Sequence, residues 1–157
     1  MKTDPPTDQS ITVDTDLARP PETVWRTLTE PALLATWLMP NDIRPVLGHR
    51  FNFRTAPVRG WDGVVHCEVL EVEPHRRLSY SWRSGLDEKG DHPGRLDTIV
   101  TWTLSPTAAG GTRLRLEHTG FLPFNAYAAK GADWGWRSKF LPRLAEVLAD
   151  LVADAVV

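Results

Sequence analysis

The sequence of 157 residues contains a single cysteine, Cys67, and no apolar run close to the roughly 20 residues that a membrane-spanning helix requires. One cysteine cannot form an internal disulfide. The first ten residues, MKTDPPTDQS, also lack the apolar segment of a signal peptide. We therefore expect a cytoplasmic protein with no membrane span.

An excess of charge of either sign is also missing, since 18 Lys and Arg stand against 20 Asp and Glu. A surface without a basic field does not attract the phosphate backbone of nucleic acids. Motifs for zinc proteolysis (HExxH), paired CxxC zinc sites, phosphate loops and dinucleotide binding (GxGxxG) are absent as well. The sequence thus predicts neither a nucleic-acid partner nor a metal or cofactor.

Tryptophan, by contrast, is abundant for a chain of this size. Each indole combines a large apolar body with one N–H donor that needs a partner when buried. Two interpretations remain open at this point: an unusually aromatic solid core, or a cavity lined by aromatic side chains. The seven tryptophans are Trp25, Trp37, Trp61, Trp82, Trp102, Trp134 and Trp136.

The chain has the length of one domain. Residues 1–9 are polar and contain two prolines, which predicts a disordered tail before a single domain over residues 10–157. Between Ile11–Leu17 and the next expected strand lie two short helices, PPETVWRTL and PALLATWLM, each opened by proline. Alternation of apolar and polar residues predicts six strands, at 11–17, 49–55, 63–73, 77–84, 97–105 and 112–119.

The connections between these strands are too short for parallel crossovers, so we expect an antiparallel sheet. Gly110 and Gly111 can both adopt positive φ in a hairpin turn before the last strand. A long amphipathic helix then follows from Asp133, a candidate N-cap, and Pro142 within it predicts a kink near Ser138. Helices segregated on one face of an antiparallel sheet make an α+β domain.

Strand alternation also predicts which side chains face the helices. Tyr80 and Trp82 lie opposite the polar side chains of their strand, and Trp102 has the same phase in the following strand. In the last strand, His118 shares the apolar face of its neighbours. We therefore expect these four side chains on the inner face of the sheet.

The phase of residues 63–73 is ambiguous, because both alternating sets contain apolar residues. Leu70 and Val72 are the better inner pair at the end of the segment. That choice places His66 and Glu68 on the inner face as well, unless a bulge resets the register. A buried glutamate requires a partner such as His66, an arginine or a ligand group.

Four segments resemble one known family. They are ARPPETVWRTLTEPALLATWL, LGHRFNF, EVLEVEPHRRLSYSW, and GGTRLRLEHTGF followed by ADWGWRSKFLPRLAEVLADL. In order and spacing they are similar to the SRPBCC, or START-like, superfamily, and within it to homologues of the activator of heat-shock-protein-90 ATPase. The resemblance implies a helix-grip fold, in which a curved six-stranded sheet and a long C-terminal helix enclose a hydrophobic cavity. A fold of this kind does not by itself specify a reaction.

Three functions are compatible with these observations. The favoured one is an intracellular binding protein for a small hydrophobic ligand, which is aromatic, polyketide-like or a lipid. The second is a cyclase, dehydratase or hydrolase that uses His118, His66 or Glu68 as acid or base. The third is an interaction module that regulates a chaperone or forms a homodimer, with Ile99 in an exposed apolar patch. The expected ligand-binding residues are Trp37, Phe53, His66, Glu68, Tyr80, Trp82, Trp102, His118, Trp136 and Phe140.

Overall fold

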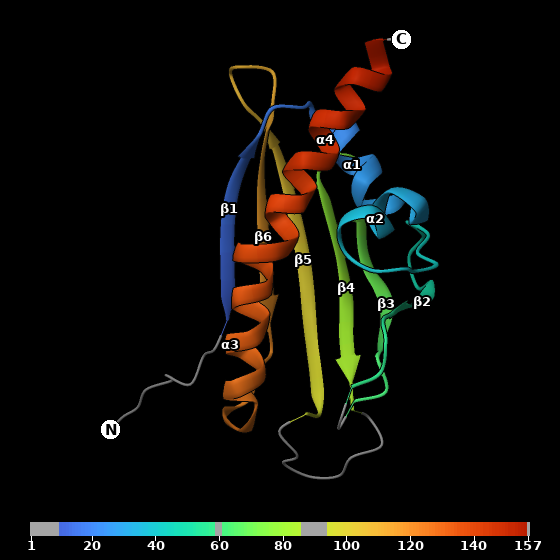
Figure 1. Cartoon of the computed structure of the whole chain (residues 1–157), viewed down its shortest axis with the longest axis vertical. Helices are drawn as coiled ribbons and strands as arrows, with labels where there is room; N and C mark the ends of the chain where they lie inside the picture. The colour runs from blue at the N-terminus through green and yellow to red at the C-terminus, as the bar shows by residue number, and fades with distance from the viewer. Residues whose placement is uncertain (1–9, 59–60, 86–93, 157) are drawn as a thin grey trace, which may run out of the picture.

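The computed structural model describes residues 10–58, 61–85 and 94–156, and the side chains up to residue 151. The expected tail over residues 1–9 lies outside the described residues. One antiparallel sheet has the strand order β1-β6-β5-β4-β3-β2, and helices cover one of its faces (Figure 1). The strands are β1 Ile11–Leu17, β2 Arg50–Arg54, β3 Val64–Glu73, β4 Arg77–Ser84, β5 Leu96–Pro106 and β6 Thr112–Thr119. The predicted six-stranded α+β fold is confirmed.

Two short helices follow β1, as the prolines predict. They are α1 Pro21–Thr29 and α2 Pro31–Trp37, and Glu30 between them has extended backbone with φ −94° and ψ 119°. Proline disfavours helical geometry in the residue before it, so Glu30 ends the first helix and Pro31 opens the second. The corner directs the buried side chains Leu28, Leu34 and Trp37 toward the sheet.

The C-terminal helix begins earlier than predicted. After the short 3₁₀ turn η1 Pro123–Asn125, α3 runs over Ala126–Gly135, so Asp133 lies inside the helix and does not cap it. Its carboxylate accepts from Arg137 Nε at 2.8 Å, one turn further along. The spacing of apolar residues does not predict the first turns of this helix, because the large apolar side chains Tyr127 and Trp134 are exposed, at 88% and 62%.

A π-helical turn, η2 Trp136–Phe140, lies where a kink near Ser138 was predicted, and at its end Leu141 N–H donates to Trp136 O. Pro142 has no N–H to offer the Ser138 carbonyl, which favours a wider turn at this point. The helix then continues as α4 Leu141–Val156 and crosses the sheet (Figure 1). Trp136 and Phe140, both expected ligand-binding residues, lie in the π turn. Among the described helices, none is long and apolar enough to cross a membrane.

The expectation that His66 and Glu68 face inward is wrong, and a β-bulge is the reason. Val65, Cys67 and Val69 are buried on the inner face, and the register of β3 against β4 then shifts between Val69 and Glu71. The bulge brings Val72 back to the inner face while Leu70 stays 39% exposed. His66 and Glu68 therefore lie on the outer face of the sheet.

The turn between β5 and β6 needs its two glycines for different reasons. Gly110 has φ +86°, as predicted, and a Cβ there would meet open space. Gly111 lacks a positive φ, but a Cβ on it would overlap the backbone oxygen of Leu17. Position 111 therefore needs a glycine because the end of β1 lies directly against its backbone.

These two glycines give a matched pair of variants. We expect Gly110→Ala to lower the free energy of unfolding by about 1 kcal/mol, the cost of a left-handed alanine. Gly111→Ala should cost about 3 kcal/mol, because backbone atoms must move apart to relieve the overlap. Urea unfolding of both variants measures the difference, and equal losses would contradict the assigned close approach.

Candidate functional site

The inner face carries a continuous layer of aromatic rings. Trp102 of β5 lies edge-to-face with Trp37 of α2, with ring centroids 5.8 Å apart, and with Trp136 of the π turn at 5.5 Å. All three are at most 2% exposed. Edge-to-face contact at these distances is the favoured geometry of packed aromatic pairs. The middle of the inner face is therefore packed core.

Tyr80 and Phe53 extend this packed layer toward β2. Both have no exposed surface, and their ring centroids lie 6.0 Å apart. The Tyr80 hydroxyl accepts a hydrogen bond from Trp102 Nε1 at 3.0 Å, and burial raises the pKa of Tyr80. Like Trp37 and Trp102, these residues point inward as predicted. With no exposed surface, all four contact only protein.

His118 is also on the inner face, but its two ring nitrogens are both engaged within the protein. Nδ1 accepts from Trp136 Nε1 at 3.1 Å, and Nε2 lies 2.8 Å from Thr98 Oγ1. The Thr98 hydroxyl in turn donates to the Trp82 carbonyl at 2.7 Å. These three hydrogen bonds can form together in one protonation state of His118 only. The imidazole is then neutral and carries its proton on Nε2.

The electrostatic environment of His118 agrees with that assignment. The side chain is 1% exposed, and burial lowers its pKa to about 3. The structure thus makes His118 a buried structural group whose hydrogen bonds join β5, β6 and the π turn.

At the rim of the aromatic layer, Trp82 and Phe140 remain partly exposed. Trp82 of β4 contacts Phe53, His118 and Trp136, with centroid distances of 5.3, 5.6 and 5.6 Å. Phe140 packs on Trp136 at 5.6 Å, and Lys139 Nζ lies 5.2 Å from the Phe140 centroid. Both aromatics rest on the packed layer and also present surface to solvent.

Two further residues belong to this inner face and were missing from the expected set. Phe121 packs on His118 with centroids 4.6 Å apart, and Phe51 lies 5.3 Å from Tyr80. Phe51 could have been found from its alternation with Phe53. Phe121 follows the last strand, where no periodic signal exists.

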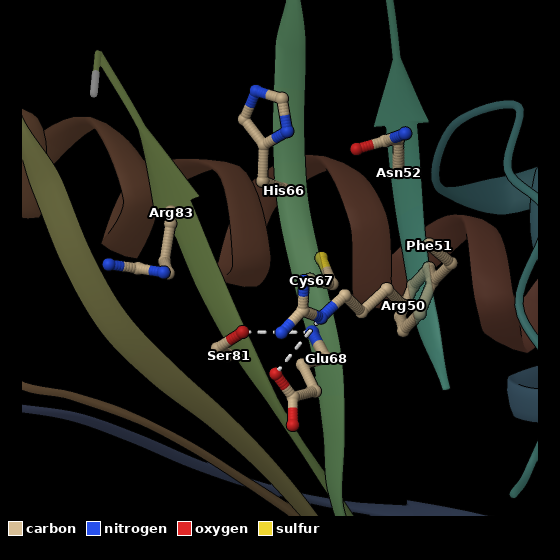
Figure 2. A pocket seen from close by; sticks show the side chains of 8 residues that line it. All are labelled: Arg50, Phe51, Asn52, His66, Cys67, Glu68, Ser81 and Arg83. Atoms are coloured by element: carbon tan, nitrogen blue, oxygen red, sulfur yellow. Dashed lines mark hydrogen bonds and ion pairs between the residues drawn. The ribbon is translucent and has the colours of Figure 1, made fainter. Parts of the chain in front are cut away.

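His66 and Glu68 line a different hollow, on the outer face over β2, β3 and β4 (Figure 2). The Arg50 side chain extends across β3, and its Nε lies 3.5 Å from Glu68 Oε1. Ser81 Oγ accepts the Glu68 backbone N–H at 2.8 Å. The hollow has a volume of about 310 Å³, and its lining also includes Asn52 and Arg83. This outer pocket is separated from the aromatic layer by the sheet.

Groups for metal or thiol chemistry are not assembled in the part of the chain that the structure describes. No three His, Cys, Asp or Glu side chains come together there as metal ligands. Cys67 is buried, and desolvation raises the pKa of its thiol, which keeps it protonated and unreactive.

Solved structures share this architecture. Protein MLL2253 from Mesorhizobium loti is 42% identical, covers 90% of this chain and 97% of its own, and superposes with a TM-score of 0.81. DynU16, assigned to the dynemicin biosynthetic locus, is 25% identical over 90% of this chain and 48% of its own, with a TM-score of 0.70. The Aha1 dimer from Colwellia psychrerythraea is 19% identical, over 88% and 95% of the two chains, also with a TM-score of 0.70, and shows the fold alone.

No protein of curated function matches the sequence. A family model, however, matches residues 18–149, from the end of β1 to the middle of α4. Its description is Activator of Hsp90 ATPase homolog 1-like protein. This range contains the aromatic layer, the rim and the outer pocket. The chain therefore belongs to the Activator of Hsp90 ATPase homolog 1-like family, with the helix-grip architecture of the SRPBCC superfamily.

Proposed function

We propose that the protein binds a small, largely apolar ligand at the rim of the inner aromatic layer, against Trp82 and Phe140. The observation that carries this proposal is that both rings are partly exposed and rest on buried aromatics. Aromatic surface of this kind contributes favourable burial to a ligand while little of the protein must be reordered.

The indole N–H groups support Trp82 as the polar contact of the site. Trp37, Trp61, Trp102 and Trp136 each donate this hydrogen to an acceptor within the protein. Trp82 and Trp25 are also packed in the core cluster or against it, and no acceptor for either N–H is found among the described residues, but only Trp82 belongs to the rim. A ligand with a carbonyl or ether oxygen would supply that acceptor. Binding sites for small molecules commonly pair apolar walls with a few such polar groups.

The ligand class follows from these contacts. An aromatic or lipid-like compound with one acceptor matches a surface of two rings and one N–H donor. The assignment of DynU16 to a biosynthetic locus is compatible with a relative that handles such a compound. An intracellular location, together with a reduced Cys67, is part of the same proposal.

The enzyme hypothesis is not carried forward, because its acid and base candidates are dispersed. It required two polar groups near one point of the inner face. His66 and Glu68 are on the outer face, and His118 uses both ring nitrogens within the protein.

The chaperone hypothesis required an exposed apolar patch that includes Ile99. Ile99 is 40% exposed, but its partners across the strands are Ser81 and Thr119, which are polar, so they do not extend an apolar patch around it.

Homodimerisation is a separate proposal for this chain, which light scattering of the purified protein would decide.

The binding proposal predicts a specific effect of Trp82. Nile red, a neutral aromatic dye with a carbonyl acceptor, should bind the wild-type protein with saturation and enhanced emission. Trp82→Ala should weaken this binding about tenfold or more, a loss of about 1.4 kcal/mol. Trp134→Ala is the matched control, because Trp134 is 62% exposed on α3 and lies outside the rim.

Trp82→Phe separates the two contributions of the side chain. It keeps an aromatic surface and removes the N–H donor, so we expect an intermediate affinity. Absence of saturable binding to the wild-type protein, or equal losses in Trp82→Ala and Trp134→Ala, would overturn the proposed site.

A further inference from the structure

The outer pocket is built from residues that stand in register on three strands. Asn52, His66 and Arg83 are partners across β2, β3 and β4, and Arg50 pairs with Glu68 in the next row. In Figure 2 the His66 ring and the Arg50 guanidinium lie over β3, while the Arg83 side chain extends from β4 toward the side away from β3. Rigid strands thus fix the spacing of several charged and polar groups around one small volume.

The two arginines of the pocket are less completely paired than other arginines on this face of the sheet. Arg113 and Arg115 each hold an aspartate through two nitrogens, with all four contacts between 2.8 and 3.2 Å. Arg83, by contrast, contacts Asp97 through Nε alone, at 3.1 Å. Arg50 meets Glu68 only through Nε, at 3.5 Å, and its side chain is 85% exposed. Among the described residues, the terminal nitrogens of both guanidinium groups have no acceptor.

His66 adds a further donor. In the amide orientation that satisfies both of its polar atoms, Asn52 donates to His66 Nδ1 at 3.1 Å and accepts from Arg54 at 3.3 Å. A neutral His66 then carries its hydrogen on Nε2. Each nearby carboxylate pairs through one of its oxygens, Glu68 Oε1 with Arg50 and Asp97 Oδ1 with Arg83.

The outer pocket therefore offers N–H donors from Arg50, Arg83 and His66. Among the charged residues that line the pocket, Arg50 and Arg83 carry two positive charges and Glu68 carries one negative charge, which leaves an excess of one positive charge. A ligand that complements this set has to bring several acceptor atoms and negative charge. Guanidinium groups meet oxyanions with two parallel hydrogen bonds, which makes them suited to phosphate and carboxylate.

We propose that the outer pocket binds the oxyanion group of a small molecule, with Arg83 and Arg50 as its main contacts. A volume of about 310 Å³ has room for such a group and for part of the molecule that carries it. This site lies on the opposite face of the sheet from the proposed ligand site at Trp82. The two proposals can therefore fail independently.

Inorganic phosphate is the probe for the test, with acetate as a second arm. The full chain, labelled with ¹⁵N, is titrated with each anion at constant ionic strength, and backbone amide shifts are followed by NMR. We expect saturable shifts around Asn52, His66 and Arg83 with a dissociation constant of about 1 mM for phosphate. Acetate should bind more weakly if a dianion is preferred, and equally if the site recognises a single carboxylate.

Arg83→Gln should weaken phosphate binding about tenfold, and Arg113→Gln is the matched control. Both side chains are about half exposed on the outer face, and both pair with an aspartate. Arg83→Gln should leave Nile red binding unchanged, which separates this site from the one at Trp82. Shifts that do not saturate, or that are equally large around Arg113, mean an adventitious ion only and overturn the proposal. An unchanged phosphate affinity in Arg83→Gln overturns it as well.

Discussion

Replacement of Trp102 by alanine is expected to lower the free energy of unfolding by about 3 to 5 kcal/mol, the range for a large aromatic side chain removed from a packed core. Trp102 has no exposed surface and lies edge-to-face with Trp37 and Trp136. The variant also leaves the Tyr80 hydroxyl without the donor that it now has at 3.0 Å. An unsatisfied buried hydroxyl adds to the cost of the cavity.

Chemical denaturation of the purified variant measures this loss, and Trp82→Ala provides the comparison. Trp82 contacts the same layer but is partly exposed, so its truncation should cost only about 1 to 2 kcal/mol. If the two variants lost equal stability, Trp102 would border a hollow space and the assignment of a packed centre would be wrong. Should Trp102→Ala not fold at all, Trp102→Phe, with an expected loss of about 1 to 3 kcal/mol, keeps the comparison measurable.

This difference between centre and rim modifies the interpretation that the family resemblance implies. A cavity enclosed by the helix was expected to be lined by Trp37, Phe53, Tyr80 and Trp102. These residues have no exposed surface and pack on one another. The proposed ligand surface therefore shrinks to the edge of the layer, at Trp82 and Phe140.

Much of the fold could be predicted because strand alternation is a local signal. The ends of β1, β4 and β6 agree with the expected ranges, since each strand has one apolar and one polar face. The corner between α1 and α2 was also predictable, because proline restricts its own backbone and that of the preceding residue. In these segments the chemistry of a few neighbours determines the geometry.

The phase of β3 could not be predicted in this way. Apolar side chains occur on both faces of the segment, and the choice between them depends on a bulge between Val69 and Glu71. A bulge is stabilised by contacts with other strands, which the sequence of one segment does not contain. The outer pocket depends on this phase, which places His66 across from Arg83 and Glu68 across from Arg50 on the outer face.

The position of His118 was predictable, but its role was not. Alternation along the last strand places it on the inner face, and Thr98 shares the inward phase of Trp102. Whether an inward histidine is a catalyst or a structural group depends on its partners. Here Trp136 comes from the helix and Thr98 from β5, so only the tertiary fold reveals that both ring nitrogens are occupied.

This arrangement predicts that His118 makes folding stability depend on pH. Its pKa is lowered from 6.5 to about 3 in the folded state, because burial removes the charged form of the ring from water. As pH falls below 6.5, the unfolded chain takes up a proton on this histidine and the folded chain does not. Protonation thus favours unfolding, and stability that is complete above the unfolded pKa is lost between pH 6.5 and about 3. Between pH 7.5 and pH 5.0 we expect a loss of about 2 kcal/mol from this residue.

Urea unfolding at the two pH values measures the total change, and His118→Gln isolates the part due to His118. The variant should lose about 2 kcal/mol less than the wild-type protein over this interval, because glutamine does not titrate. The shifts of histidine ring protons provide a second measurement that needs no variant. The His118 ring should stay neutral down to about pH 4, well below the ordinary histidine range. A normal titration of His118 near pH 6.5, or the same pH dependence in His118→Gln, would show that the buried chain from Trp136 through His118 to Thr98 does not hold the ring neutral.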